Sequence, residues 1–209
     1  MVESWFFLES PAADAATNMA VDDMLLRTTR QRGRALLRVY TWSKPAISIG
    51  YFQKFPQTDR EVVRRPTGGG LVYHGDDTTF TIVAPAGHSL YRLRTAEAYG
   101  AIHEAVARAT GATLQTAGQV PRGSYECFQR PVAGDVVADG RKLAGGAQRR
   151  NRDGMLHQGS IAARVTGEQL CRALGFRFEP YTLTGEDRAM VTWLVDGKYR
   201  NDAWNRRVV

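Results

Sequence analysis

An Asp-Gly dipeptide between two apolar stretches places the strongest constraint on how this chain can fold. Asp139-Gly140 separates VAGDVV (132–137) from RKLAGGAQ (141–148). A D-G pair in this setting favours a tight turn of the primed type, so the two stretches are predicted to form an antiparallel hairpin. We expect that hairpin to bring the residues before its first strand towards Lys142 in its second strand.

One of only two cysteines, Cys127, stands before this hairpin and fifteen residues before Lys142. The thiolate is the attacking form of a cysteine, and a neighbouring ammonium favours it, so the two residues are a candidate catalytic pair. A buried structural cysteine beside a surface lysine is the alternative, which composition alone favours. Cys171 falls on the buried side of a predicted helix (168–175) and is interpreted as structural. With no CxxC motif, neither a disulfide framework nor a metal site is expected.

Three consecutive glycines mark a second informative stretch, RRPTGGGLVYHGDDTTFTIVAP (64–85). Glycines allow a backbone to approach a ligand closely and to adopt positive φ angles. Two predicted strands, LVYH and TTFTIVA, follow the glycines. A phosphate-binding motif of the Walker or dinucleotide type requires a helix at that point, so the stretch is neither of these motifs. Flanked by Arg64 and Arg65, the stretch is a candidate site for a phosphate or a carbonyl, with a merely tight loop as the alternative.

The remaining chain predicts helices and strands in one unbroken domain, 1–209, without repeats or linkers. Hydrophobic spacing and end signals predict helices at 16–33, 95–111 and 186–195, with Asp14 capping the first and Gly33 ending it. Strands are predicted at 35–42, 46–50 and 155–163. We interpret His103, on the second of these helices, as a surface residue.

The composition narrows the class of partner. Apolar residues make up 43% and charged residues 23% of the 209 positions, as in soluble globular proteins. No apolar run is long enough to cross a membrane, and the opening MVESWFFLES lacks a basic segment followed by a long apolar one. A cytoplasmic location without membrane contact is therefore expected. The net charge of +7 favours an acidic partner, either nucleic acid or a small acidic protein. No nucleic-acid recognition motif is present, but charge alone does not choose between the two, and a solvated arginine-rich surface is the alternative.

Five motifs in order resemble those of the lipoate-protein ligase A / octanoyltransferase superfamily, relatives of biotin protein ligase. They are NMAVDDMLL (18–26), RVYTWSKPAISIGYFQ (38–53), RRPTGGGLVYH (64–74), GRKLAGGAQRR (140–150) followed by LHQGSI (156–161), and DGKYRNDAW (196–204). The second of them resembles a pair of strands that follows the first helix.

The resemblance implies a mixed α/β (α+β) fold: a biotin/lipoyl protein ligase-like catalytic domain with a central, mostly antiparallel mixed sheet flanked by helices. It implies an acyl tunnel between the glycine stretch and the lysine strand, with Cys127 and Lys142 as catalytic residues. His74 would either shuttle a proton or form part of the wall. The binding residues that it implies are Arg65, Thr67, Gly68, Gly69, Gly70, His74, Gly145, Ala147, His157 and Gly159.

The family holds two chemistries, and three features favour a cysteine-type octanoyltransferase. Cys127 heads a C-F-x-x-P segment. After His74 the chain reads Gly75-Asp76-Asp77 where ligases continue as D-x-G-N, and DTTFT (77–81) is closer to the transferase pattern. No accessory C-terminal domain is expected. The implied reaction moves octanoate from acyl carrier protein, through a Cys127 thioester, to a lipoyl-domain lysine of a glycine cleavage H protein or a 2-oxoacid dehydrogenase E2. It requires no cofactor, and acidic carrier and lipoyl-domain partners account for the net charge of +7 better than nucleic acid does.

Three alternatives remain open. An ATP-dependent lipoate-protein ligase, alone or as the catalytic subunit of a two-chain enzyme, would use ATP, Mg and lipoate. An amidotransferase would move octanoyl or lipoyl groups between lipoyl domains through the same cysteine. A non-catalytic acyl-binding module would lack any acyl-enzyme, and the presence of both Cys127 and Lys142 argues against it.

Overall fold

An eight-stranded mixed sheet organises the computed structural model, which describes residues 3–116 and 131–207. The order of its strands is β11-β1-β2-β6-β10-β9-β8-β7. β1 runs parallel to both β11 and β2, and every other neighbouring pair is antiparallel. The strands are β1 Ser4–Glu9, β2 Leu36–Tyr40, β6 Thr78–Pro85, β7 Thr113–Leu114, β8 Val136–Ala138, β9 Arg141–Arg150, β10 Gly154–Ile161 and β11 Arg177–Pro180. The predicted mostly antiparallel mixed sheet is confirmed.

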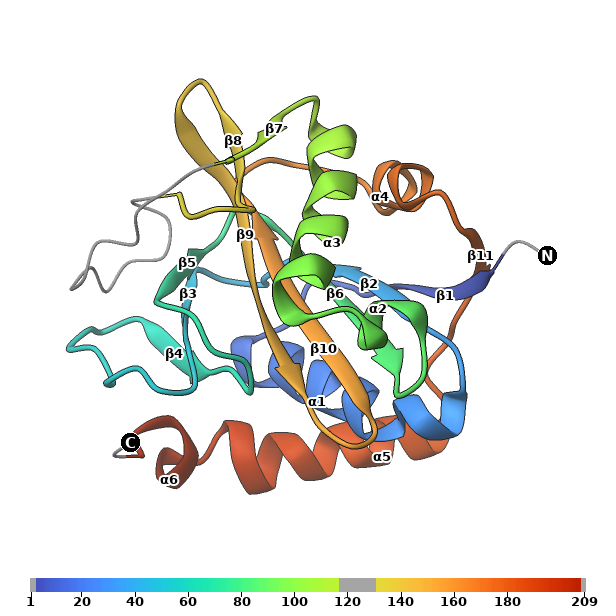
Figure 1. Ribbon diagram of the computed structural model, residues 1–209. Helices are drawn as coiled ribbons and strands as arrows, with labels where there is room; N and C mark the ends of the chain where they lie inside the picture. The colour runs from blue at the N-terminus through green and yellow to red at the C-terminus, as the bar shows by residue number, and fades with distance from the viewer. Residues whose placement is uncertain (1–2, 117–130, 208–209) are drawn as a thin grey trace.

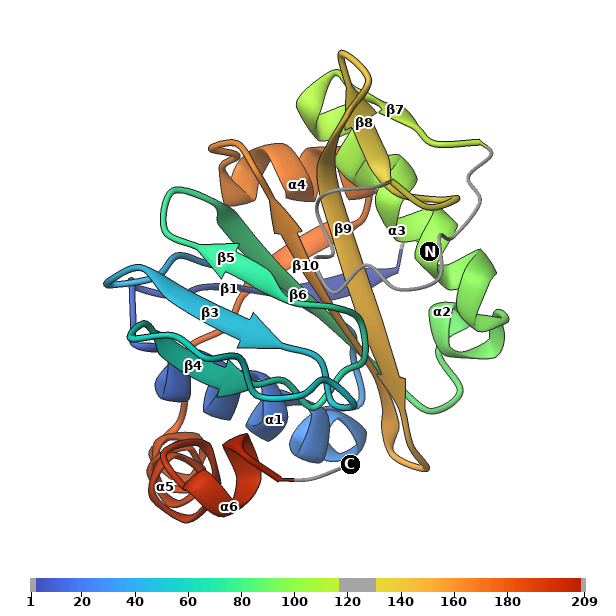
Figure 2. The same cartoon turned by 90° about the vertical axis from the view of Figure 1, so that its left-hand side faces the viewer.

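A separate three-stranded sheet stands beside β9 and β10 (Figure 2). Its order is β4-β3-β5, with β3 Ala46–Ile49 parallel to β4 Glu61–Arg64 and antiparallel to β5 Val72–His74. The pairing expected between the strands of 38–53 is therefore wrong. β2 pairs with β1 and β6 in the large sheet, and the chain crosses to the small sheet between the two strands.

Helices cover both faces of the large sheet (Figure 1). One face packs against α1 and α5, and the other packs against α3 and α4. Consecutive strand residues point to opposite faces, so Leu36 joins the first core and Leu37 joins the second. The helices are α1 Ala15–Arg32, α2 Ser89–Arg92, α3 Thr95–Thr110, α4 Gly167–Leu174, α5 Gly185–Leu194 and α6 Asp202–Asn205, with a π-helical turn at Val195–Tyr199.

Local signals fix the ends of the elements as expected. Asp14 accepts a hydrogen bond from Thr17 N at the start of α1, and Gly33 ends the helix with φ 71°. In the β8–β9 hairpin, Asp139 and Gly140 both have positive φ, 50° and 72°. A type I′ turn needs positive φ at both central residues, so the predicted turn is confirmed.

Candidate active site

A cavity lies between the small sheet and the strands β9 and β10, and residues of α1, β2 and β6 also line it. It holds about 450 Å³ of empty space, including the part open to solvent. The residues that line it are Met19, Tyr40, Trp42, Ser48, Arg65, Gly69, Val72, His74, Thr79, Lys142, Gly145, Gly146, Ala147, Gln158, Gly159 and Ser160.

Arg65 shapes the glycine loop, residues 66–70, from beneath. Its Nη2 donates to the carbonyls of Gly68 and Gly70 at 3.0 and 2.8 Å, and its Nη1 donates to Ser48 O and Oγ. Gly69 has a φ of 84°. The loop also crosses another glycine so closely that a Cβ on Gly50 would stand 1.9 Å from Gly69 O. The glycines thus let two backbones meet, and the arginine holds the loop in place.

Lys142 reaches the cavity from β9 with its side chain almost fully buried. Its Nζ lies 2.8 Å from Asp135 Oδ2, in an ion pair whose side chains are 3% and 0% exposed. The lysine folds back across Gly145, where an added Cβ would stand 2.4 Å from Lys142 Cε. Because Gly145 has no side chain, it leaves the space that the lysine side chain occupies.

His74 forms one wall of the cavity, and both of its ring nitrogens have partners. Its Nδ1 lies 2.7 Å from Asp77 Oδ2 and its Nε2 lies 2.6 Å from Ser48 Oγ. Trp42 stacks on the ring at 3.9 Å between centroids. Burial lowers the pKa of His74 despite the nearby carboxylate. Since Asp77 can only accept, the neutral imidazole carries its proton on Nδ1 and accepts from the serine hydroxyl.

Asp77 is the ionised partner of His74. Burial by itself would raise its pKa, but the hydrogen bond and charge of His74, with bonds from Gly75 N and Ser160, bring it to about 2. Ser160 Oγ donates to Asp77 Oδ2 at 2.7 Å. The arrangement ties β10 to the start of β6 and keeps the His74 ring in one orientation.

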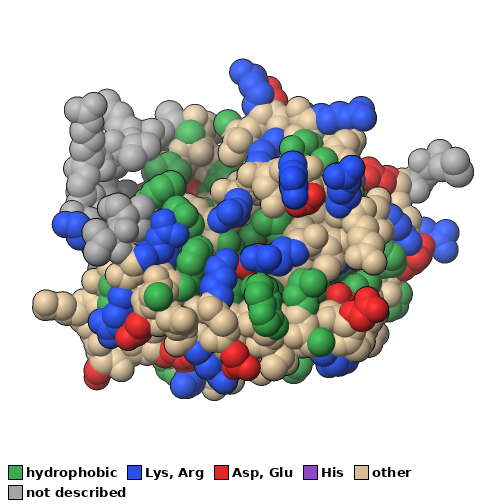
Figure 3. Space-filling view, turned by 90° about the horizontal axis from the view of Figure 1, so that it is seen from below, with side chains coloured by type: hydrophobic (Ala, Val, Ile, Leu, Met, Phe, Trp, Pro, Cys, Tyr) green, Lys and Arg blue, Asp and Glu red, His purple; other side chains and the backbone are tan. Residues whose placement is uncertain are grey.

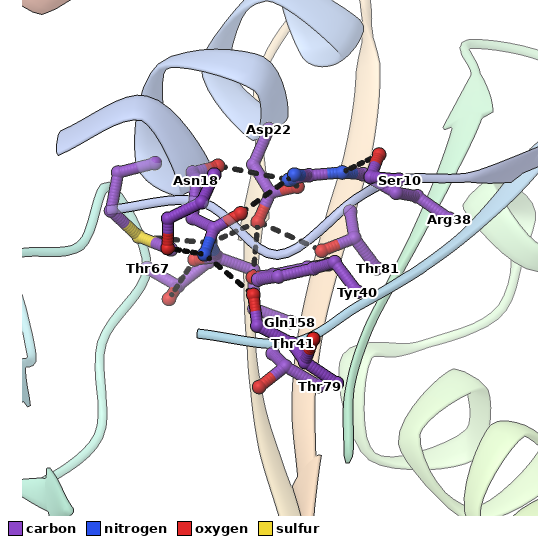
Figure 4. A network of polar contacts seen from close by, with 12 residues as sticks. Ser10, Asn18, Asp22, Arg38, Tyr40, Thr41, Thr67, Thr79, Thr81 and Gln158 are labelled. Atoms are coloured by element: carbon purple, nitrogen blue, oxygen red, sulfur yellow. Dashed lines mark hydrogen bonds and ion pairs between the residues drawn. The ribbon is translucent and has the colours of Figure 1, made fainter. Parts of the chain in front are cut away.

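Gln158 links the cavity to a buried polar network beneath it (Figure 4). Its Nε2 donates to Asp22 Oδ2 at 2.7 Å, and its Oε1 accepts from Thr67 Oγ1 at 2.7 Å. Asp22 is fully buried and pairs with Arg38 at 2.7 Å. Tyr40 OH also donates to Asp22 Oδ2, at 3.0 Å. The network fixes the amide of Gln158 and, through Thr67, tethers the glycine loop to the core.

The next-door residue, His157, faces the opposite side of the sheet. It is fully buried against Phe80, Tyr99 and His103. The expected surface position of His103 is wrong, because its side chain is 0% exposed and its Nδ1 lies 2.8 Å from Gly134 O. Burial lowers the pKa of His103 to about 4 and that of His157 well below its usual value.

The cavity brings most of the predicted site residues together. Its lining includes Arg65, Gly69, His74, Lys142, Gly145, Ala147 and Gly159. Thr67 donates a hydrogen bond to Gln158, which lines the cavity. Gly68 and Gly70 belong to the loop that Arg65 holds. Asp135, Tyr99 and Gln158 were not among the predicted site residues, although the position of Asp135 just before β8, seven residues from Lys142, was a usable signal.

Cys127 lies outside the described residues. The other cysteine, Cys171, is half-buried, and burial, with Glu168 and Glu9, raises its pKa to about 11. Among residues 3–116 and 131–207, no group of three or more His, Cys, Asp or Glu side chains could hold a metal ion. None of the helices described there is long and apolar enough to cross a membrane.

Comparison with known proteins places this geometry in a family. A family model described as the lipoyl protein ligase A/B catalytic domain matches residues 14–191. Octanoyltransferase LipM of Oceanobacillus iheyensis is 37% identical over 186 residues, which cover 81% of this chain and 68% of that protein. Octanoyltransferase LipM of Geobacillus kaustophilus is 30% identical, with 97% of this chain and 98% of that protein covered.

Solved structures share the fold at lower identity. A lipoate-protein ligase A bound with ATP superimposes with a TM-score of 0.76 at 19% identity, over 100% of both chains. A bi-partite lipoate protein ligase from Thermoplasma acidophilum, solved in a study that includes its E2 lipoyl domain, gives a TM-score of 0.71 at 19% identity, over 100% of this chain and 98% of that one. The chain belongs to the lipoyl protein ligase A/B catalytic domain family.

Proposed function

We propose that this protein is a protein N-octanoyltransferase that moves a medium-chain acyl group onto a lysine of a lipoyl domain. The observation that carries the proposal is the buried ion pair of Lys142 with Asp135 on the wall of this cavity. Relatives that cover most of the chain bear the name octanoyltransferase LipM. The C-F-x-x-P segment that begins at Cys127 adds a nucleophile from the sequence.

The reaction proceeds in two acyl transfers. Cys127 Sγ attacks the carbonyl carbon of an octanoyl thioester, the carrier thiol leaves with the proton, and a thioester on Cys127 remains. The ε-amine of the acceptor lysine then attacks that carbonyl, which yields an amide and restores the cysteine thiol. Lys142 supplies positive charge where the carbonyl oxygen becomes anionic in both transfers. Because a thioester is higher in energy than an amide, neither ATP nor a metal is needed.

The cavity walls suit a short acyl chain. Met19, Tyr40, Trp42 and Val72 give it an apolar side, which favours the transfer of a hydrocarbon tail out of water. Lys142 and the backbone at Gly145 to Ala147 line the cavity as well. This division matches an acyl tail at one end and a reacting carbonyl at the other.

The surface charge suits acidic protein partners. The chain carries a net charge of +7, and Lys and Arg side chains outnumber acidic ones on the face shown in Figure 3. Opposite net charges speed the encounter of two proteins. We therefore take acyl carrier protein as the donor and a lipoyl domain as the acceptor.

An ATP-dependent lipoate ligase is the competing function, since the fold is shared with a ligase that was solved with ATP. The two arginines that flank the glycine loop offer it little support. Arg64 and Arg65 are buried and donate to backbone carbonyls of this chain, which commits their guanidinium groups to holding the fold.

One experiment separates the two functions. The protein is incubated with octanoyl-acyl carrier protein without ATP, and the intact mass is followed. We expect an octanoyl thioester adduct that hydroxylamine removes and that Cys127→Ala lacks. Cys171→Ser serves as the matched control and should keep the adduct, because burial leaves that thiol protonated. Absence of an adduct together with lipoylation that requires ATP would establish the ligase instead.

A further inference from the structure

Asp135 is a buried carboxylate that no motif of the sequence singled out. Asp135 lies just before β8 and is 0% exposed. Its Oδ2 accepts from Val132 N at 2.8 Å and stands 2.8 Å from Lys142 Nζ. The backbone on both sides is held too, because Asp135 O accepts from Gln115 N at 2.8 Å. The carboxylate therefore has a fixed place and direction behind the lysine.

Tyr99, from α3, holds the other oxygen of that carboxylate. Its hydroxyl donates to Asp135 Oδ1 at 2.7 Å and accepts from Gly146 N at 3.0 Å. The ring packs so tightly on the preceding turn that a Cβ on Gly134 would stand 3.0 Å from it. One tyrosine thus connects a helix, the carboxylate and the backbone of the lysine strand, four residues after Lys142.

The charges around the lysine leave one clear counter-ion among the described residues. Asp135 faces Lys142 from the segment before β8. Helix α3 contributes Tyr99 and His103, whose rings contact each other, and β10 contributes His157, whose ring contacts His103. Burial lowers the pKa of both histidines, so each is neutral near pH 7. A buried ammonium is costly without a partner charge, and here the carboxylate provides it.

We propose that Asp135, supported by Tyr99, is a positioning residue that keeps Lys142 charged and aimed into the acyl cavity. The proposal rests on the function proposed above, because it assigns Lys142 the task of stabilising the carbonyl oxygen. Asp135 does not touch the substrate. It acts through the direction and charge of Lys142 Nζ, and Tyr99 acts through Asp135.

Four variants test this role. Asp135→Asn keeps the shape of the side chain and removes its charge, Asp135→Glu restores the charge, and Tyr99→Phe removes one hydrogen bond. Asp139→Asn is the matched control, because Asp139 is exposed in the turn of the same hairpin, and asparagine tolerates its positive φ of 50°. Octanoyl transfer from octanoyl-acyl carrier protein to a lipoyl domain is measured from pH 6 to pH 9, with kcat and KM separated.

The expected effects fall on kcat. Asp135→Asn should lower it about a hundredfold, as removal of one transition-state donor does, with KM within about threefold of the parent protein. As pH rises, its activity should also begin to fall at a lower pH than that of the parent protein, because removal of the facing carboxylate disfavours the ammonium form of Lys142. Asp135→Glu should recover part of kcat, Tyr99→Phe should lose about tenfold, and Asp139→Asn should match the parent. A folded Asp135→Asn protein with the parent rate and pH profile would overturn the proposal.

A second measurement does not depend on the reaction. Competitive acetylation with acetic anhydride, followed by peptide mass analysis, compares the reactivity of Lys142 with that of the exposed Lys44. Asp135→Asn should increase acetylation of Lys142 relative to Lys44 at neutral pH, and an unchanged ratio would reject the role of Asp135. If the parent protein forms no acyl adduct, the proposed function fails, while this ratio still tests the Asp135–Lys142 pair.

Discussion

Adjacent glycines in the lysine strand have different roles at the scale of single residues. A Cβ on Gly145 would meet Lys142 Cε at 2.4 Å and Nζ at 2.6 Å, which are the far end of a flexible side chain. A Cβ on Gly146 would meet His157 Nε2 at 2.5 Å and Gln158 O at 2.9 Å. The first obstacle can swing aside, whereas the second is a buried ring and a backbone carbonyl.

These contacts predict different outcomes for two alanine variants. Gly145→Ala should lose about a hundredfold in acyl transfer, because Lys142 is displaced from the cavity. Gly146→Ala should lose about 1 to 3 kcal/mol of stability through overpacking. Urea unfolding and the acyl-enzyme assay, run on both, check the pair. A parent-like acyl-transfer rate in Gly145→Ala, or parent-like stability in Gly146→Ala, would contradict these roles.

At the scale of elements, side chains alternate between the two faces of β10, and this decides which of two adjacent residues faces the cavity. Gln158 points to the cavity and the polar network, while His157 points to the cluster with Tyr99 and His103. The motif LHQGSI alone does not show which face is which, because that depends on the layers that pack against the strand. The strand itself was predictable, and its orientation was not.

The buried histidine on α3 gives the fold a dependence on pH. The pKa of His103 is about 4 in the folded protein, below its usual value of 6.5. The contribution of His103 to the free energy of unfolding is therefore at its full value above about pH 6.5. It is lost as pH falls from there towards 4, since the unfolded chain binds the proton first. At pH 5 we expect a loss of about 2 kcal/mol from this residue relative to pH 7.

The variant His103→Asn checks this expectation. It remains neutral at both pH values, so the difference in unfolding free energy between pH 7 and pH 5 should be smaller by about 2 kcal/mol than in the parent. Denaturant unfolding at the two pH values provides the numbers. The same difference in both proteins would mean that His103 titrates normally in the folded state.

At the scale of the whole molecule, Arg64 joins the small sheet to the C-terminal helix. The side chain is buried, and its Nη1 donates to Tyr51 O and Gln53 O at 2.9 and 2.6 Å. Its Nη2 donates to Asn205 O at 2.8 Å. The sequence offered Arg64 as a candidate ligand for a phosphate or carbonyl, and the structure shows it connecting segments that are 141 positions apart.

We expect Arg64→Lys to destabilise the protein by about 3 kcal/mol, because one ammonium cannot replace a planar group that serves several carbonyls. Arg60→Lys is the matched control, since Arg60 is exposed just before the same strand, and it should stay within about 0.5 kcal/mol of the parent. Thermal or urea unfolding decides between them. Equal stabilities would show that the arginine is dispensable for joining the two parts.

The sequence by itself determined the family, the main helices and strands, and the hairpin that carries Lys142. These rest on local signals: hydrophobic spacing, helix caps, an Asp-Gly turn and motifs in a fixed order. Only the tertiary structure decided that Asp135 and Tyr99 stand behind Lys142, that Gln158 faces the cavity, and that Arg64 and Arg65 hold backbone. Tyr99 reaches Asp135 across 36 positions, Gln158 reaches Asp22 across 136, and Arg64 reaches Asn205 across 141. Contacts between segments so far apart leave no periodic or local mark in a single sequence.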